Sequence, residues 1–183
     1  ENRDWANWEK KMSVDPADRD DSLAVTRPRP GHADLVGSQK YGHDDIRNVL
    51  ERASARETTS RVAAGALCRQ VLERFGISIM GYVGEVGGIE ASLDGLTPEA
   101  AFERAEASEV RMADAEAGAK VIALVDECKK TGDTLGGVVE VCVTGLPPGL
   151  GSYVHYDRKV DGRLAGALLA VQAVKGVELG AGF

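Results

Sequence analysis

The sequence has few aromatic residues, no long apolar run and no excess of basic charge. Aromatic side chains make up 5% of its 183 residues, and no stretch approaches the roughly 18 apolar residues of a membrane-spanning helix. The formal net charge of −7 argues against general affinity for nucleic acid or for an anionic membrane surface. We therefore expect no nucleic-acid partner and no membrane partner. An anionic ligand would need a local cluster of basic residues that acts against the overall charge.

Cysteine is also scarce. Cys68, Cys128 and Cys142 are odd in number and far apart, and none has the spacing of metal ligands. Cys68 and Cys128 fall within apolar helical patterns, which is typical of reduced core residues. Since the sequence also shows no signal peptide, it predicts a cytoplasmic protein without a metal site.

Glycine, in contrast, is abundant. The 22 glycines exceed the usual share of about 7% and favour tight turns and close backbone approach. The hydrophobic share of 43% and the charged share of 28% are ordinary for a globular protein. A chain of 183 residues can bury one sizeable core, so we expect a single domain over 1–183. The chain begins with ENRDW and ends with GAGF, and we expect it to be a fragment of a longer protein.

The stretch ERASARETTSRVAAGAL, residues 51–67, predicts the start of a helix. Ser54 followed by Glu57 fits a capping box, in which the hydroxyl accepts a backbone N–H and the carboxylate reaches back. Apolar residues then recur at helical spacing as far as Phe75, and Gly76 is a natural end. We expect this helix to run from about Glu57 to Phe75.

Three arginines, Arg52, Arg56 and Arg61, lie near the start of this helix. Their charges repel one another, while the free N–H groups and the dipole of a helix N-terminus favour an anion. Guanidinium groups are planar donors suited to phosphate or carboxylate. The stretch predicts an anion site at a helix N-terminus with two unpaired guanidinium groups. The alternative is an exposed, well-capped helix whose arginines are solvated.

A second cationic segment lies at residues 26–34, TRPRPGHAD. Pro28 and Pro30 exclude a helix and force an extended path, and Gly31 allows a bend. This constrained loop holds Arg29 and His32, and histidine is the side chain best suited to proton transfer near neutral pH. The pattern predicts a catalytic histidine. The alternative is a structural histidine bonded to a loop carbonyl.

The remaining patterns mix helices with strands, which predicts the α+β class. Residues 35–50 resemble a polar connector, and a Gly/Pro loop is expected at 145–157. Strands are predicted over 77–91, broken at Gly87-Gly88, and over 136–144, and helices after Thr97 and over 113–130 and 158–175.

Four motifs extend through essentially the whole chain. They are RPGHAD at 29–34, ERASARET at 51–58, DTLGGVVE at 133–140, and GLPPGLGSYVHYDRKVDGRLAGALLAVQAVKGVELGAGF at 145–183. Together, and in this order, they resemble chorismate synthase. The resemblance implies a lyase of the shikimate pathway. Members convert 5-enolpyruvylshikimate 3-phosphate to chorismate by a 1,4-elimination of phosphate that requires reduced FMN without consuming it.

The resemblance also implies a fold and an assembly. The family fold is a β-α-β sandwich, with sheets packed about central helices, assembled as a homotetramer. A fragment would hold this fold incompletely. The resemblance leaves open whether NADPH serves as the reductant of the flavin.

Site residues follow from the same motifs. By the resemblance, His32 is the proton donor near the flavin, and Arg29 and Arg56 bind the phosphorylated small-molecule substrate. The residues expected to contact the flavin are Arg52, Ala53, Ser54, Gln172 and Ala173.

The sequence departs from the family pattern at its ends and at two positions. We expect the N-terminal segment with its GESHG histidine and the C-terminal part to be missing, while Ala53 stands where serine is commonest and Pro148 where a small aliphatic residue is more usual. The competing interpretation is therefore a catalytically inactive fragment that keeps part of a flavin or phosphate site, or only an oligomerisation surface. An unrelated phosphate-binding regulatory domain is a third interpretation.

Overall fold

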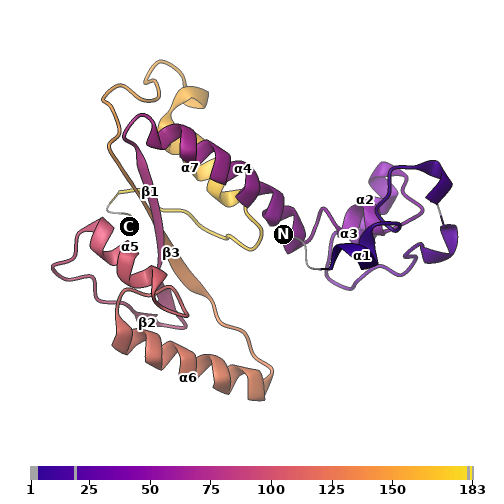
Figure 1. The fold of residues 1–183 in the computed structure, drawn as a ribbon, viewed down its shortest axis with the longest axis horizontal. Coiled ribbons are helices and arrows are strands. Elements are labelled where there is room, and N and C mark those ends of the chain that lie inside the picture. The colour runs from indigo at the N-terminus through magenta and orange to yellow at the C-terminus, as the bar shows by residue number, and fades with distance from the viewer. Residues whose placement is uncertain (1–3, 19, 181, 183) are drawn as a thin grey trace. The chain divides into compact units, whose positions relative to one another are not determined.

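The computed structural model of the chain describes residues 4–18, 20–180 and 182, and mixes helices with strands (Figure 1). The predicted domain 1–183 also includes residues 1–3, 19, 181 and 183, which lie outside the described part. Two compact units are present, one formed by Glu1–Gly65 with Tyr153–Phe183 and the other by Ala66–Ser152. The expectation of a single domain stays a prediction.

Short helices form the N-terminal part of the first unit. They are α1 (Trp5–Trp8), the 3-10 turns η1 (Pro16–Asp18) and η2 (Asp21–Leu23), α2 (Asp34–Tyr41) and α3 (Arg47–Leu50). The prediction of a polar connector over 35–50, with Asp44 or Asp45 capping a short turn, is therefore wrong for the helices but holds for the cap, because Asp45 Oδ1 accepts from the N–H of Arg47 at 2.9 Å. Gly37 of α2 lies against the side chain of Val49 in α3 with no room for a Cβ, and this close tertiary contact stabilises two helices that are too short to form alone.

The C-terminal part of the first unit holds η3 (Tyr156–Arg158) and α7 (Val160–Leu169). The helix predicted over 158–175 is therefore too long at its C-terminal end. The chain turns after Leu169, and Ala173 adopts a left-handed backbone conformation with φ +70°, which no α-helix can continue.

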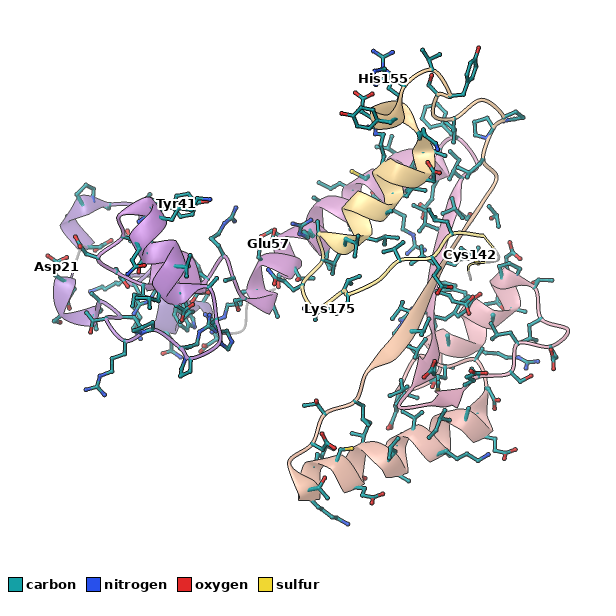
Figure 2. The ribbon with its side chains drawn as sticks, turned by 180° about the vertical axis from the view of Figure 1, so that it is seen from behind. Asp21, Tyr41, Glu57, Cys142, His155 and Lys175 are labelled. Carbon is teal, nitrogen blue, oxygen red and sulfur yellow. The ribbon has the colours of Figure 1, made fainter. Side chains whose placement is uncertain are left out.

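Helix α4 (Ala55–Glu73) starts two residues before the predicted Glu57. Ser54 Oγ accepts a hydrogen bond of 3.3 Å from the backbone N–H of Arg56, which forms the first half of the predicted capping box. The second half is wrong, because the carboxylate of Glu57 (labelled in Figure 2) instead accepts from Arg61 Nε at 2.8 Å. Arg61 is therefore not one of the two unpaired guanidinium groups expected at the start of this helix.

The predicted stop at Gly76 is confirmed, although α4 itself ends at Glu73, two residues before the predicted Phe75. Gly76 has φ +75° and donates its N–H to Glu73 O at 3.0 Å, while Ile77 donates to Leu72 O at 3.1 Å. These are the two bonds of a Schellman motif, in which a left-handed glycine closes the helix.

The second unit is built on an antiparallel sheet with strand order β2-β1-β3. Its strands are β1 (Ser78–Val86), β2 (Ile89–Glu90) and β3 (Gly137–Thr144). The break predicted at Gly87-Gly88 is confirmed as the turn between β1 and β2, where both glycines have positive φ. Positive φ at two successive residues is accessible to glycine at little cost, so the turn depends on this pair.

Two amphipathic helices pack against the sheet, α5 (Pro98–Glu106) and α6 (Ala115–Thr131). As predicted, Thr97 caps α5, with Oγ1 accepting from the N–H of Ala100 at 3.3 Å. Asp114 caps α6 by accepting from Glu116 and Ala117. Gly132, left-handed with φ +74°, ends α6.

The core of this unit consists of two clusters of buried side chains. One joins Tyr82 of β1 to α5, through Ala101, Ala105 and the nearby Ala113. The other centres on Met112 and α6, with Ala117 and Val121. The small alanine side chains allow the helices to approach the sheet closely, which is consistent with the scarcity of aromatic side chains in the sequence.

Strand β3 leaves much of its apolar surface uncovered. Val139, Val141 and Val143 are 67%, 49% and 37% exposed, and in the described part of the chain β3 pairs only with β1. All three cysteines are free thiols, and Cys142 lies on β3 (Figure 2). Cys68 on α4 is exposed, so the prediction that it is a core residue is wrong for this chain.

Candidate functional site

The loop before α2 is held by one buried carboxylate. Asp34, which is completely buried, accepts hydrogen bonds of 2.9 Å from the backbone N–H, Nε and Nη2 of Arg29. The bend needed to bring these residues together occurs at Gly31, with φ +71°. The Arg29 side chain and backbone bonds lower the pKa of Asp34 to about 2, so the carboxylate is charged at neutral pH.

His32 projects from this loop and is exposed. Its Nδ1 lies 2.9 Å from the carbonyl oxygen of Pro30. Because a carbonyl oxygen can only accept, Nδ1 carries a hydrogen, and Nε2 is the atom left to exchange a proton. This is the bond expected of a structural histidine, yet it also presets the tautomer that a proton donor acting through Nε2 needs.

Arg56, on the first turn of α4, is held by two groups. Its Nη1 donates to Glu51 Oε1 at 2.5 Å, and its guanidinium carbon lies 4.8 Å from the centre of the Trp8 ring. The prediction of an unpaired guanidinium is therefore wrong for Arg56. Its Nε and Nη2, however, make no hydrogen bond within the described ranges.

Glu51 connects the two predicted cationic segments. It binds Arg56 directly and also acts on Arg29, whose pKa is raised by the hydrogen bonds to Asp34 and further by the negative charge of Glu51. One half-buried carboxylate therefore interacts with both Arg29 and Arg56, in the same unit as His32.

The predicted flavin contacts are less closely connected. Arg52 is exposed, and its side chain makes no hydrogen bond or ion pair with any part of the chain that the structure describes. The neighbouring Ala53 is half-buried and donates its N–H to Val49 O at 2.9 Å. Gln172 and Ala173 are exposed in the turn after α7, and no described hydrogen bond joins them to Arg52.

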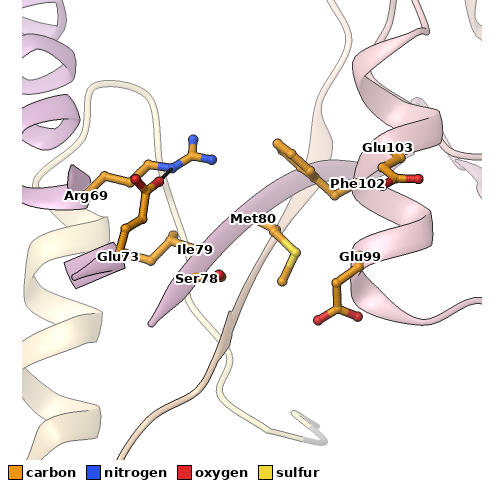
Figure 3. Close-up of a pocket in the computed structure, with 8 residues that line it drawn as sticks. All are labelled: Arg69, Glu73, Ser78, Ile79, Met80, Glu99, Phe102 and Glu103. Carbon is orange, nitrogen blue, oxygen red and sulfur yellow. Dashed lines mark hydrogen bonds and ion pairs between the residues drawn. The ribbon is translucent and has the colours of Figure 1, made fainter. Parts of the chain in front are cut away.

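Two hollows in the surface are lined by residues other than the predicted site residues. One of about 260 Å³ is lined by Arg69 and Glu73 of α4, by the start of β1, and by Phe102 and its neighbours on α5 (Figure 3). Another of about 800 Å³ lies beside α5 and α6. Neither is lined by a predicted site residue. Among the described residues, no group of three His, Cys, Asp or Glu side chains could hold a metal ion, and no helix is long and apolar enough to cross a bilayer.

Comparison with known proteins decides the family. The family model described as chorismate synthase matches residues 1–183. The chain belongs to the chorismate synthase family. It is 55% identical over 182 residues to a chorismate synthase of Geobacter metallireducens, and 56% identical over 189 residues to one of Symbiobacterium thermophilum. Each alignment covers 100% of this chain but only 46% and 48% of the relative, so the chain spans about half the length of these family members.

A solved chorismate synthase structure has the same fold. It matches with a TM-score of 0.75 and 46% identity, covering 82% of this chain and 47% of that chain. The likeness confirms the predicted α+β class and the β-α-β sandwich of the chorismate synthase family, of which this chain holds about half.

Sequence reasoning missed the residues that fix the predicted arginines. Asp34 was expected only as part of the loop and Glu51 only as the first residue of the motif ERASARET, and no role in the site was predicted for Trp8. The signal for Asp34 is its spacing of five residues from Arg29 across Pro30-Gly31. No local signal identifies Trp8 as a partner of Arg56, because the two lie 48 positions apart (56 minus 8).

Proposed function

We propose that a protein of full family length that contains this chain, called here the full-length enzyme, is a chorismate synthase. It would remove phosphate from 5-enolpyruvylshikimate 3-phosphate by 1,4-elimination: one C–O bond breaks, one proton leaves the ring, and chorismate forms. The match of the family to all of residues 1–183 carries this proposal. The shikimate pathway is the metabolic context.

The chain's own residues support the substrate class. Paired planar donors are well suited to a phosphate group, and Arg56 keeps its Nε–Nη2 edge unbonded within the described chain while its other terminal nitrogen is bonded to Glu51. His32 would hold or transfer a proton at Nε2. Arg29, whose Nε–Nη2 edge binds Asp34, offers only Nη1 and its charge to the substrate.

Reduced FMN is the proposed cofactor, with NADPH as a candidate reductant. When bound, the reduced flavin supplies electron density to the elimination without net consumption. The described residues fit an anionic group of this kind in one respect: Arg52 is exposed with no intramolecular partner in the described chain, and Ser54 beside it carries a hydroxyl donor. Gln172 and Ala173 are exposed, and their proposed contact with the flavin rests on the family motif.

A cytoplasmic homotetramer is the proposed state of the full-length enzyme. Family membership supports this assembly, and the uncovered valines of β3 show that the described part has apolar surface available for burial. Light scattering coupled to size-exclusion chromatography measures the mass directly.

The test is an anaerobic assay of the full-length enzyme with reduced FMN and 5-enolpyruvylshikimate 3-phosphate. We expect equal amounts of chorismate and inorganic phosphate, and no product with oxidised FMN. Absence of both products from a folded protein that binds flavin would contradict the proposal. The same assay on residues 1–183 alone tests the inactive-fragment interpretation, and we expect no turnover there because half of the family length is missing.

A further inference from the structure

We propose that Trp8 is a positioning residue for anion binding, and that it acts through Arg56. This inference rests on the proposed function, because it assumes that Arg56 meets the phosphorylated substrate. Nothing in the motifs assigns a role to Trp8, which lies outside all four of them.

The guanidinium group of Arg56 is held by an aromatic ring and by a carboxylate. The guanidinium carbon of Arg56 lies 4.8 Å from the centre of the Trp8 ring, within the distance at which a cation is attracted to an indole face. Glu51 binds Nη1 of the same guanidinium. The ring contact and the carboxylate together restrict the orientation of the guanidinium group, and its Nε–Nη2 edge is the pair of donors left without a hydrogen bond in the described chain.

The indole is itself fixed. Trp8 Nε1 donates to Asp4 Oδ2 at 2.8 Å, so the ring cannot rotate without breaking a bond to a charged acceptor. Lys11 Nζ lies 5.4 Å from the same ring, but an ammonium group is a point charge without a plane to stack. The ring therefore orients Arg56 and not Lys11.

Orientation has an energetic consequence for binding. A free arginine side chain loses rotamer freedom when it binds an anion, whereas one already held by an aromatic ring and a carboxylate has lost that freedom beforehand. Trp8 would lower the entropic cost of binding at Arg56 without touching the substrate. Its removal should weaken substrate binding and leave the proton transfer at His32 unaffected.

The experiment compares W8L, W8F and W5L in the full-length enzyme, by steady-state kinetics with reduced FMN. Trp5 is the matched control, since it is in the same short helix, is half exposed and stacks on no described cation. We expect the KM for the phosphorylated substrate to rise about 5-fold in W8L, the scale of one partly exposed cation–π contact. In W8F the rise should be smaller, because a ring is retained, and in W5L KM should be unchanged.

A double-mutant cycle separates positioning from general structure. In an R56A background, W8L should have no further effect on KM, because the group it orients is gone. An unchanged KM in W8L, or an equal effect of W8L with and without Arg56, would overturn the proposal. If W8L does not fold, the same double-mutant cycle is measured with W8F, for which the expected change in KM is smaller.

A binding readout keeps this proposal separate from the proposed function. Inorganic phosphate is titrated into W5F, and the emission of Trp8 is obtained by subtracting the signal of W5F/W8F. We expect a saturable change in W5F and none in W5F/R56A, even if the wild type shows no turnover. No change in W5F would contradict the role of Trp8, while product formation in the wild type would leave the function standing.

Discussion

Arg29 and Arg56 use the same donor edge differently. The Nε–Nη2 edge of Arg29 is closed by the buried carboxylate of Asp34, whereas the same edge of Arg56 is open within the described chain and only its Nη1 is bonded. The two arginines are thus unequal candidates for a substrate anion. Arg56 is equipped to bind one, and Arg29 mainly shapes the loop that carries His32.

The Arg29–Asp34 pair predicts a loss of stability in acid. The pKa of Asp34 is lowered from 3.8 to about 2 in the folded protein, so this pair stabilises the fold fully above about pH 4 and its contribution is lost as the pH falls toward 2. Thermal unfolding of the full-length enzyme between these values measures the effect. In D34N, which cannot ionise, the melting temperature should be lower near neutral pH and should lose this part of its acid dependence; an unchanged slope would contradict the assignment.

His32→Ala tests the proton donor. We expect kcat to fall on the order of 10²–10⁴-fold, because a group that transfers a proton contributes chiefly in the transition state. Flavin affinity, measured by titration of the protein with FMN, should change little. H43A is a matched control on an exposed histidine beyond the loop, and an unchanged kcat in H32A would remove His32 from the reaction.

Arg56→Lys tests the planar donor. Lysine keeps the charge but loses both the stacking plane and the paired donors, so KM should rise and kcat should fall as the leaving phosphate is misplaced. Since the side chain is 58% exposed, the melting temperature should stay nearly constant, corresponding to about 0.5 kcal/mol or less. Reduced stability with unchanged kinetics would instead make Arg56 a structural residue of the helix terminus.

Met112→Ala tests the core of the second unit. Met112 is 1% exposed and packs with Ala117 and Val121, so its truncation should lower the free energy of unfolding by about 2–5 kcal/mol. Ile122→Ala is the matched control on α6, since Ile122 is 39% exposed and should cost much less. Chemical denaturation of the full-length enzyme measures both, and equal losses would place Met112 outside the core.

The sequence predicts the features that depend on neighbouring residues. Gly76 ends α4, Thr97 caps α5 and Gly87-Gly88 turns β1 into β2, because each is decided by backbone conformation or a hydrogen bond within a few positions. Helices α2 and α3 are missed, since their stability comes from the Gly37–Val49 contact. At the site, motifs identify the arginines and the histidine, but the partners Glu51 and Trp8 emerge only when the chain folds.

The uncovered strand β3 bears on how the chain behaves by itself. Its second edge presents backbone donors and acceptors with no partner in the described chain, and its exposed valines are among the residues most prone to pair with a neighbouring strand. Isolated copies of these 183 residues therefore carry a template for self-association into larger sheets. Low solubility of the isolated chain would reflect this edge, independently of any defect in the residues around Arg56 and His32.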